Sequence, residues 1–347
     1  MKKILAIVLC LCTLLTVLVA CGEKEADYKL GMGVVVSTAS SKEGLAQVDA
    51  TIATVVTDAE GKIVLCRIDV AQNKFDLTKD FATEAAKTFK TKMELGDDYN
   101  MAKYGTPNVE GGTVKEWYVQ TKAFEEYVVG KTVSEVEAIE TKEVNNHQIP
   151  VDEALLNAGC TMQITEFKAA VAKACKDEQG MAFKAVAGTF TLGVAAKTTV
   201  DSSTKAATET EAGAVNMYTD MACAVVVEGK VVATLNDAIQ PKIATNAAGA
   251  TTPAEFKGTK RELKEGYNMA AYGAPNVEGG TVKEWYVQSA AFSNYVVGKT
   301  ATEIAGMETK EVNNHQISTE QALLDAGCTM QITGICAVVA QSANNAR

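Results

Sequence analysis

Runs of apolar residues near the start of the chain predict strands. Asp49–Val56 and Ile63–Val70 are rich in β-branched residues and flank the polar turn Ala59–Lys62. Because Gly61 occupies the tight position of that turn, the two runs are predicted to form a β-hairpin. The same pattern returns later in the chain, at Met221–Val227 and Val231–Leu235.

The next apolar residues recur at helical spacing. Within Val114–Val129, the side chains of Trp117, Phe124 and Val128 fall on one helical face, and Gly130 is expected to end the helix. Strands followed by helices, without regular alternation, predict an α+β fold.

Short signals subdivide the rest of each helical stretch. Thr132–Glu135 and Thr300–Glu303 match the capping box that opens a helix. Pro150–Leu156 predicts a short helix that Gly159 closes. Cys160–Thr165 is then predicted as a strand, with Cys and Met on the core side and Thr on the polar side.

The N-terminus reads as a targeting segment, residues 1–20. Lys2 and Lys3 precede the apolar run Ile4–Val19, which is short for a bilayer span of roughly 20 residues. Leu18-Val19-Ala20-Cys21 resembles the bacterial lipobox, in which the cysteine is lipidated and becomes the new N-terminus. We therefore expect a lipid anchor at Cys21 on the outer face of the cell membrane. The alternative is an ordinary signal peptide with a chance cysteine.

An internal duplication organises the mature chain. Tyr99–Thr132 and Tyr267–Thr300 differ at six of 34 positions, at an offset of 168 residues. A period of this length indicates two domains rather than a solenoid repeat. We place the domains at residues 28–179 and 184–340, each long enough to bury a core of its own.

Charge excludes one class of partner. The formal net charge is −10, and removal of the leader takes away two lysines and no acids, which leaves −12. An acidic surface argues against nucleic acid as a partner.

The cysteines do not repeat as a disulfide framework would. Of the six that follow Cys21, Cys160 and Cys328 alone occupy matching places in the two copies. We interpret most of them as small buried apolar residues. A Cys160–Cys175 or a Cys328–Cys336 bridge is the alternative.

The histidines and tryptophans give weak functional signals. His147 and His315 each stand in the string Glu-Val-Asn-Asn-His-Gln-Ile, and no Cys or His lies at ligand spacing from them, so we expect loop histidines and no metal site. Trp117 and Trp285 are interpreted as core residues.

A repeated threonine is the best candidate for chemistry. Ala158-Gly159-Cys160-Thr161 returns as Ala326-Gly327-Cys328-Thr329. Each string presents a hydroxyl directly after small residues that let a bulky group approach. The plainer interpretation is a glycine that stops a helix, followed by an edge strand in which threonine is common.

Several motifs together resemble the FMN-binding domain of flavin-carrying subunits in sodium-pumping NADH:quinone oxidoreductase and Rnf complexes. The likeness is closer to Gram-positive lipoproteins with two such domains that act in extracellular electron transfer. The motifs are the lipobox, Glu-Gly-Lys-Ile/Val, Lys-Glu-Leu before Tyr-Asn-Met in the second copy, the related Lys92–Tyr99 string in the first, Lys-Glu-Trp-Tyr-Val-Gln, Tyr-Val-Val-Gly-Lys-Thr and the late threonine.

The resemblance implies a covalent flavin. In that family a flavin transferase splits FAD and leaves FMN as a phosphoester on a Thr or Ser, which here would be Thr161 and Thr329. The adjoining residues Gly159, Cys160, Gly327 and Cys328 would then belong to the two FMN sites. Here Ala-Gly-Cys-Thr stands where the family usually has Ser-Gly-Ala-Thr.

The function implied is electron carriage rather than enzymatic turnover. Electrons would come from a membrane partner that oxidises quinol and would leave to extracellular acceptors. Two alternatives remain: a protein that binds FMN without a covalent bond, and a duplicated surface lipoprotein that binds a partner and has no redox group.

Overall fold

The computed structural model describes residues 24–347, and they form a mixed α+β protein with antiparallel sheets. The predicted leader and the lipidation candidate Cys21 lie outside the described residues. Within the described part, no helix combines the length and apolar character needed to cross a membrane. The α+β prediction is confirmed, because the strands pair in antiparallel order and the helices occupy separate stretches of the chain.

Each repeat starts with three antiparallel strands. They are β1 (Glu25–Ser37), β2 (Leu45–Thr57) and β3 (Ile63–Asp76) in the first repeat, and β7 (Phe190–Val200), β8 (Gly213–Val227) and β9 (Lys230–Ile239) in the second. β6 (Met181–Val186) adds a fourth strand beside β1, and β10 (Lys242–Thr245) and β11 (Thr251–Pro253) extend the second sheet beside β8. The predicted strands lie within β2, β3, β8 and β9, and Gly61 has the positive φ of 76° that the first hairpin needs.

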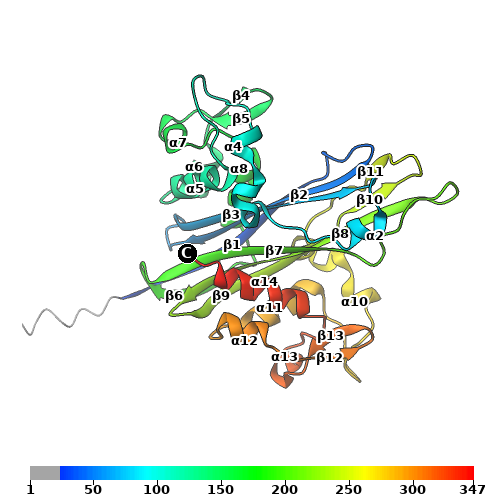
Figure 1. Cartoon of the computed structure of the whole chain (residues 1–347). Coiled ribbons are helices and arrows are strands. Elements are labelled where there is room, and N and C mark those ends of the chain that lie inside the picture. The colour runs from blue at the N-terminus through cyan, green and yellow to red at the C-terminus, as the bar shows by residue number, and fades with distance from the viewer. Residues whose placement is uncertain (1–23) are drawn as a thin grey trace, which may run out of the picture.

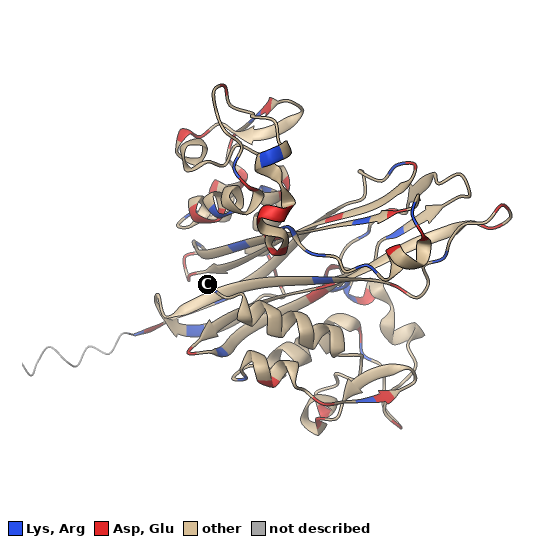
Figure 2. Ribbon diagram, in the orientation of Figure 1, with Lys and Arg blue, Asp and Glu red and all other residues tan. Residues whose placement is uncertain are grey.

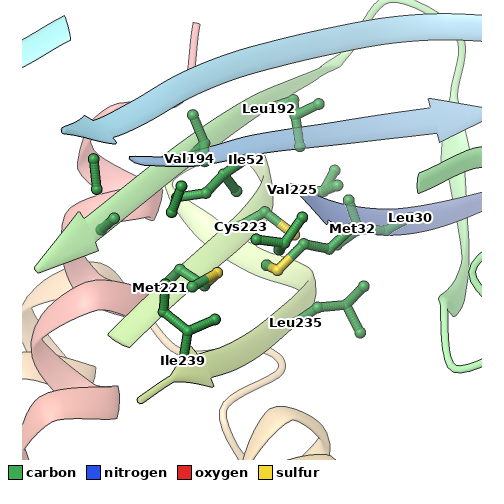
Figure 3. Packing of buried hydrophobic residues seen from close by; sticks show 14 of the residues in the cluster. Leu30, Met32, Ile52, Leu192, Val194, Met221, Cys223, Val225, Leu235 and Ile239 are labelled. Carbon is green, nitrogen blue, oxygen red and sulfur yellow. The ribbon is translucent and has the colours of Figure 1, made fainter. Parts of the chain in front are cut away.

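The two sheets stack face to face and bury a common core between them (Figure 3). Buried residues of both repeats line it, among them Leu30, Met32, Ile52, Cys223 and Val225. The edges also meet, since β3 runs beside β7 and β6 beside β9. The expectation of a separate core for each repeat is therefore only half met, because the inner face of each sheet is covered by the other repeat.

Most helices cover the outer faces, those of the first repeat on one side and those of the second on the opposite side, whereas α2 lies beside β8 and packs against the core between the sheets (Figure 1). The first repeat has α2 (Phe81–Ala85), α3 (Lys92–Leu95), the 3-10 helix η1 (Gly96–Tyr99), α4 (Met101–Tyr104), α5 (Trp117–Val128), α6 (Val133–Glu137), the hairpin β4 (Thr141–Val144) and β5 (His147–Pro150), α7 (Glu153–Ala158) and α8 (Thr165–Cys175). The second has α9 (Lys260–Leu263), η2 (Lys264–Tyr267), α10 (Met269–Tyr272), α11 (Trp285–Tyr295), α12 (Ala301–Ala305), β12 (Thr309–Val312), β13 (His315–Ser318), α13 (Gln321–Asp325) and α14 (Thr333–Asn344).

Local predictions for these helices are largely confirmed. The helix predicted over Val114–Val129 is α5, whose buried face includes Trp117, Phe124 and Val128. Both predicted capping boxes are present, at the starts of α6 and α12. Each helical layer packs on its own sheet through a second apolar cluster that belongs to one repeat.

Some contacts between the repeats occur twice: a residue of the first repeat contacts one of the second, and the equivalent residues make the same contact with the repeats interchanged. Lys173 of α8 reaches Glu262 of α9 at 2.7 Å, and Gln341 of α14 reaches Glu94 of α3, also at 2.7 Å. Both partners of the second contact are displaced by 168 residues from those of the first. The repeats thus form an approximately twofold arrangement, with acidic and basic residues interspersed over its helices and loops (Figure 2).

Candidate functional site

The candidate threonines lie in a loop, not in a strand. Residues 160–164 make no strand and lead from the end of α7 directly into α8. The strand prediction for Cys160–Thr165 is therefore wrong, although the alternation behind it holds: Cys160, Met162 and Ile164 are buried, and Thr161 is half-buried. A short loop with a bend at Met162 therefore gives the same alternation of burial without a partner strand.

Two side chains fix the position of Thr161. The Oε1 of Gln120, in α5, accepts from the Thr161 backbone N at 2.9 Å and from its hydroxyl at 3.3 Å. Asn108 donates to the Thr161 carbonyl at 3.0 Å. Gln120 is only 1% exposed, and its Nε2 donates to the carbonyl of Lys115 at 2.8 Å, which sets the orientation of the amide. The hydroxyl is thus held in one direction at the edge of a buried network.

The second repeat reproduces this arrangement. Gln288 accepts from the backbone N of Thr329 at 2.9 Å and from its hydroxyl at 3.5 Å, and Asn276 donates to the Thr329 carbonyl at 2.9 Å. The sequence interpretation did not assign these glutamines and asparagines a role. The duplication could have pointed to them, because both residues are the same in the two repeats within the stretch where the repeats are most alike.

Gly159 and Gly327 close the preceding helices in the left-handed region, at φ 101° and 93°. A lysine lies across each of them: Lys115 donates to the carbonyl of Ala158 at 3.3 Å, and Lys283 makes the equivalent bond at 3.1 Å. A Cβ built on either glycine would stand 2.2 Å from the lysine Nζ. The positive φ therefore favours glycine at both positions, and a larger residue would also displace the end of the lysine side chain.

Replacing Gly159 by alanine is expected to lower the free energy of unfolding by about 1–2 kcal/mol, because alanine is disfavoured at positive φ. Chemical denaturation followed by circular dichroism measures the loss. Gly61→Ala is the matched control, since Gly61 also has a positive φ but nothing lies within 4 Å of its Cβ position. A larger loss at Gly159 that shrinks in the Lys115→Ala background would identify the lysine. No loss at Gly159 would contradict this account of the loop.

Cys160 and Cys328 lie in the outer cores of their repeats and are fully buried. Burial raises the pKa of both thiols to about 12, so they stay protonated. The six cysteines among residues 24–347 are free, which contradicts both proposed disulfides and confirms their interpretation mostly as buried apolar residues. Within the site they contribute packing behind the threonine loop.

A cavity of about 740 Å³ opens beside Thr161. This volume is within the range of about 300–1,000 Å³ that small-molecule and cofactor sites occupy. Apolar and aromatic residues form part of the wall: Tyr99, Met101, Val114, Trp117, Met162 and Phe167. Polar residues complete it, including Asp49, Thr51, Lys92, Asn108, Gln120 and His147.

The wall of this cavity offers distinct recognition groups. Trp117 packs edge-on against Phe167, with ring centroids 5.9 Å apart. The Nζ of Lys92 lies 4.8 Å from the ring centroid of Tyr99 and 5.4 Å from that of Trp117. Asp49 Oδ2 accepts from Gln47, whereas its Oδ1 is shielded from solvent and has no hydrogen-bond partner among residues 24–347. The cavity thus combines aromatic surface, a cation and a free acceptor, which suits a planar, polar heterocycle.

The histidines lie at the outer hairpins. His147 begins β5 and His315 begins β13, each directly after two asparagines at positive φ, and both side chains are exposed. Among the described residues, no cluster of three or more His, Cys, Asp or Glu side chains is arranged to hold a metal ion. His147 nonetheless reaches the rim of the Thr161 cavity.

Two further cavities, of about 670 and 500 Å³, lie between the repeats at equivalent places. The first contains Asp237 and the second Asp69, its counterpart 168 residues earlier. Burial raises the pKa of both carboxyls to about 6. Backbone N–H groups partly oppose this effect: Met93 donates to Asp69 and Arg261 to Asp237, each at 3.1 Å. Neither cavity includes a candidate threonine.

Comparison of the chain with protein-family models, with curated proteins and with solved structures finds no match. The likeness to FMN-binding domains therefore stays a prediction, based on the motifs quoted above.

Proposed function

We propose that this protein is a membrane-anchored extracellular flavoprotein that carries electrons, with FMN attached covalently to Thr161 and, in the second repeat, to Thr329. The position of Thr161 supports this proposal. Its oriented hydroxyl borders a cavity of cofactor size whose wall includes the aromatic side chains of Tyr99, Trp117 and Phe167 and the lysine Lys92.

Attachment requires a flavin transferase and FAD. The Thr161 oxygen bonds to the phosphorus of the FMN half, the pyrophosphate bond of FAD breaks, AMP leaves, and the hydroxyl proton is released. No oxidation or reduction occurs in this step. For an exported protein the ester has a clear advantage, because a micromolar site, worth about −8 kcal/mol, stays mostly empty where free flavin is scarce.

The chain's own residues would position the bound cofactor. Trp117 and Tyr99 offer faces for stacking, Lys92 offers positive charge, and Asp49 Oδ1 offers an acceptor for an N–H or O–H group. When bound, the isoalloxazine supplies reversible electron transfer, while the protein supplies orientation and electrostatics.

The proposed partners follow from the lipid anchor. With lipid on Cys21, few residues separate the membrane from β1, which holds the first repeat near the lipid surface. Electrons would enter from a quinol-oxidising membrane protein and leave to extracellular acceptors. The acidic chain, with a net charge of −10, is not suited to nucleic acid.

Coexpression with a flavin transferase tests the proposal. Intact mass is expected to show two additions of FMN less water, and the denatured protein is expected to fluoresce in a gel. Thr161→Ala and Thr329→Ala should each remove one addition, and the double variant should remove both. Thr165→Ala, at the exposed start of α8, is the matched control and should keep both.

The outcomes separate the candidate functions. An unchanged mass with a yellow native protein that bleaches on denaturation would favour noncovalent FMN. A colourless protein from a host competent in flavin transfer would favour a surface-binding lipoprotein without a redox group. A mass gain that survives replacement of both threonines would reject their assignment as attachment points.

A further inference from the structure

The two repeats differ at the wall of the proposed flavin cavity. Strand register aligns Asp49 with Tyr218. Leu30 and Leu192 are equivalent residues at the starts of the two repeats. Asp49 pairs with Ser37, which follows Leu30 by seven residues, and Tyr218 pairs with Thr199, which follows Leu192 by seven residues. The same register aligns Thr51 with Asp220. A small acid and a threonine in the first repeat are therefore replaced by a large aromatic residue and an acid in the second.

Tyr218 contacts the counterparts of the residues that line the first cavity. Its hydroxyl lies 3.0 Å from the Nζ of Lys260, which corresponds to Lys92. That Nζ is 4.5 Å from the ring centroid of Tyr218, 4.6 Å from Tyr267 and 5.7 Å from Trp285. Lys260 is only 6% exposed, whereas Lys92 is half-buried and its ring contacts are with Tyr99 and Trp117. An added aromatic ring thus encloses the lysine.

A third position changes together with these two. Glu166 lines the cavity of the first repeat, and its counterpart 168 residues later is Gly334. A Cβ at Gly334 would stand 2.2 Å from Oδ2 of Asp220. The missing side chain therefore makes room for the Asp220 carboxylate, which keeps a negative charge near the enclosed lysine. Together, the three differences place a tyrosine ring in the space beside Lys260 and set the Asp220 carboxylate against the positive charge of this lysine.

We infer that the two attachment sites are not equivalent: a preformed cavity in the first repeat receives the flavin ring, whereas Tyr218 and Lys260 occupy the corresponding space in the second. This inference rests on the proposed function. A flavin tethered to Thr329 keeps its ring at the protein surface, where it can meet extracellular acceptors. A flavin tethered to Thr161 has its ring enclosed, so the repeats divide the work of holding and delivering electrons.

Riboflavin binding tests the inference without any covalent bond. The probe has no phosphate, so in protein purified from a host without a flavin transferase it reports ring binding alone. Isothermal titration of the complete mature chain is expected to give one equivalent of riboflavin. Two equivalents would show equivalent repeats and none would show no preformed cavity, and either result overturns the inference.

Exchanging the differing residues assigns the site. Tyr218→Asp combined with Asp220→Thr and Gly334→Glu copies the first repeat at all three positions, and is expected to raise binding from one equivalent to two. Asp49→Tyr should close the first cavity and lower binding to none. Lys74→Tyr, which adds the same ring at an exposed position of β3 outside the cavity, should keep one equivalent. Circular dichroism confirms folding of each variant. If the opening variant does not fold, Asp49→Tyr alone decides, and one equivalent retained there overturns the inference.

The result is separable from the test of covalent attachment. A chain that gains FMN on coexpression but binds two riboflavins, or none, contradicts this inference and leaves the proposed function standing. A chain that binds one riboflavin but gains no FMN supports the cavity assignment and rejects the covalent bond.

Discussion

Replacing Asp177 by alanine is expected to lower the free energy of unfolding by about 3–5 kcal/mol, the usual result of leaving a buried charge without its partner. Asp177 follows α8 and pairs with Arg261 of the second repeat at 3.0 Å, and their side chains are 9% and 7% exposed. Asp177 also accepts from the backbone N of Met32 at 3.1 Å. Because β6 pairs with β1 only as far as Leu30, this bond satisfies a strand donor that has lost its neighbour.

The adjacent residue supplies a matched control. Glu178 pairs with Lys264 across the same interface, at 3.6 Å, but the two side chains are 86% and 43% exposed. Glu178→Ala is therefore expected to change the unfolding free energy by less than about 1 kcal/mol. Urea denaturation followed by circular dichroism measures both variants. Equal losses at Asp177 and Glu178 would show that the repeats are not joined through the buried pair.

Sequence reasoning found the parts of the fold that depend on local pattern. The hairpin around Gly61, the helix that contains Trp117 and Phe124, and the capping box at Thr132 all arise from residues close in sequence, and all are present. Their signals are spacing, turn chemistry and cap identity, none of which requires a distant partner.

The shared core between the sheets was not predicted, although the strands carry a signal for it: neighbouring residues that point to opposite faces are both apolar. Ile52 and Ala53 are neighbours in β2 and point to opposite faces, yet both are fully buried, as are Ala222 and Cys223 in β8. A strand that is apolar on both faces is covered on both faces. Helices cover one face, and the second repeat covers the other. The apolar runs are what a sheet covered on both faces requires, but the identity of the covering sheet depended on long-range packing.

The surroundings of the candidate site could be predicted only in part. The sequence singled out Thr161, which borders a large cavity, and Gly159, which has the required positive φ. It gave no role to Gln120, because a glutamine in a helix signals nothing until the loop that it holds is placed beside it. The asymmetry at Asp49 and Tyr218 was also out of reach, since the duplicated stretches differ by small insertions and only strand register aligns these residues.

Replacing both Asp69 and Asp237 by asparagine is expected to remove a large part of the pH dependence of stability between pH 4 and 6. The two carboxyls are 3% and 4% exposed, and burial raises the pKa of each from 3.8 to about 6. In this interval the folded chain binds more protons than the unfolded chain, so stability falls as pH rises from about 4 to about 6. A shift of this size corresponds to about 3 kcal/mol for each carboxyl.

Urea denaturation at pH 3, 4, 5, 6 and 7.5 measures this slope in the parent chain and in both single variants. Asn keeps an oxygen that can accept from the Met93 and Arg261 backbone N–H groups but cannot ionise. Burial raises the pKa of Asp220 to about 6 as well, so each single variant should flatten the slope by about a third. Asp76→Asn is the control with the opposite sign: hydrogen bonds from Thr78 lower the pKa of Asp76, so its stabilising contribution is lost as the pH falls below about 4.

If the Asp69 and Asp237 variants leave the slope between pH 4 and 6 unchanged, the cavities between the repeats hold these carboxyls in contact with water. The approximate twofold arrangement predicts that the two single variants respond alike. A response confined to Asp69 would show that the positive charge of Arg261, which lowers the pKa of Asp237, outweighs the effect of burial at Asp237.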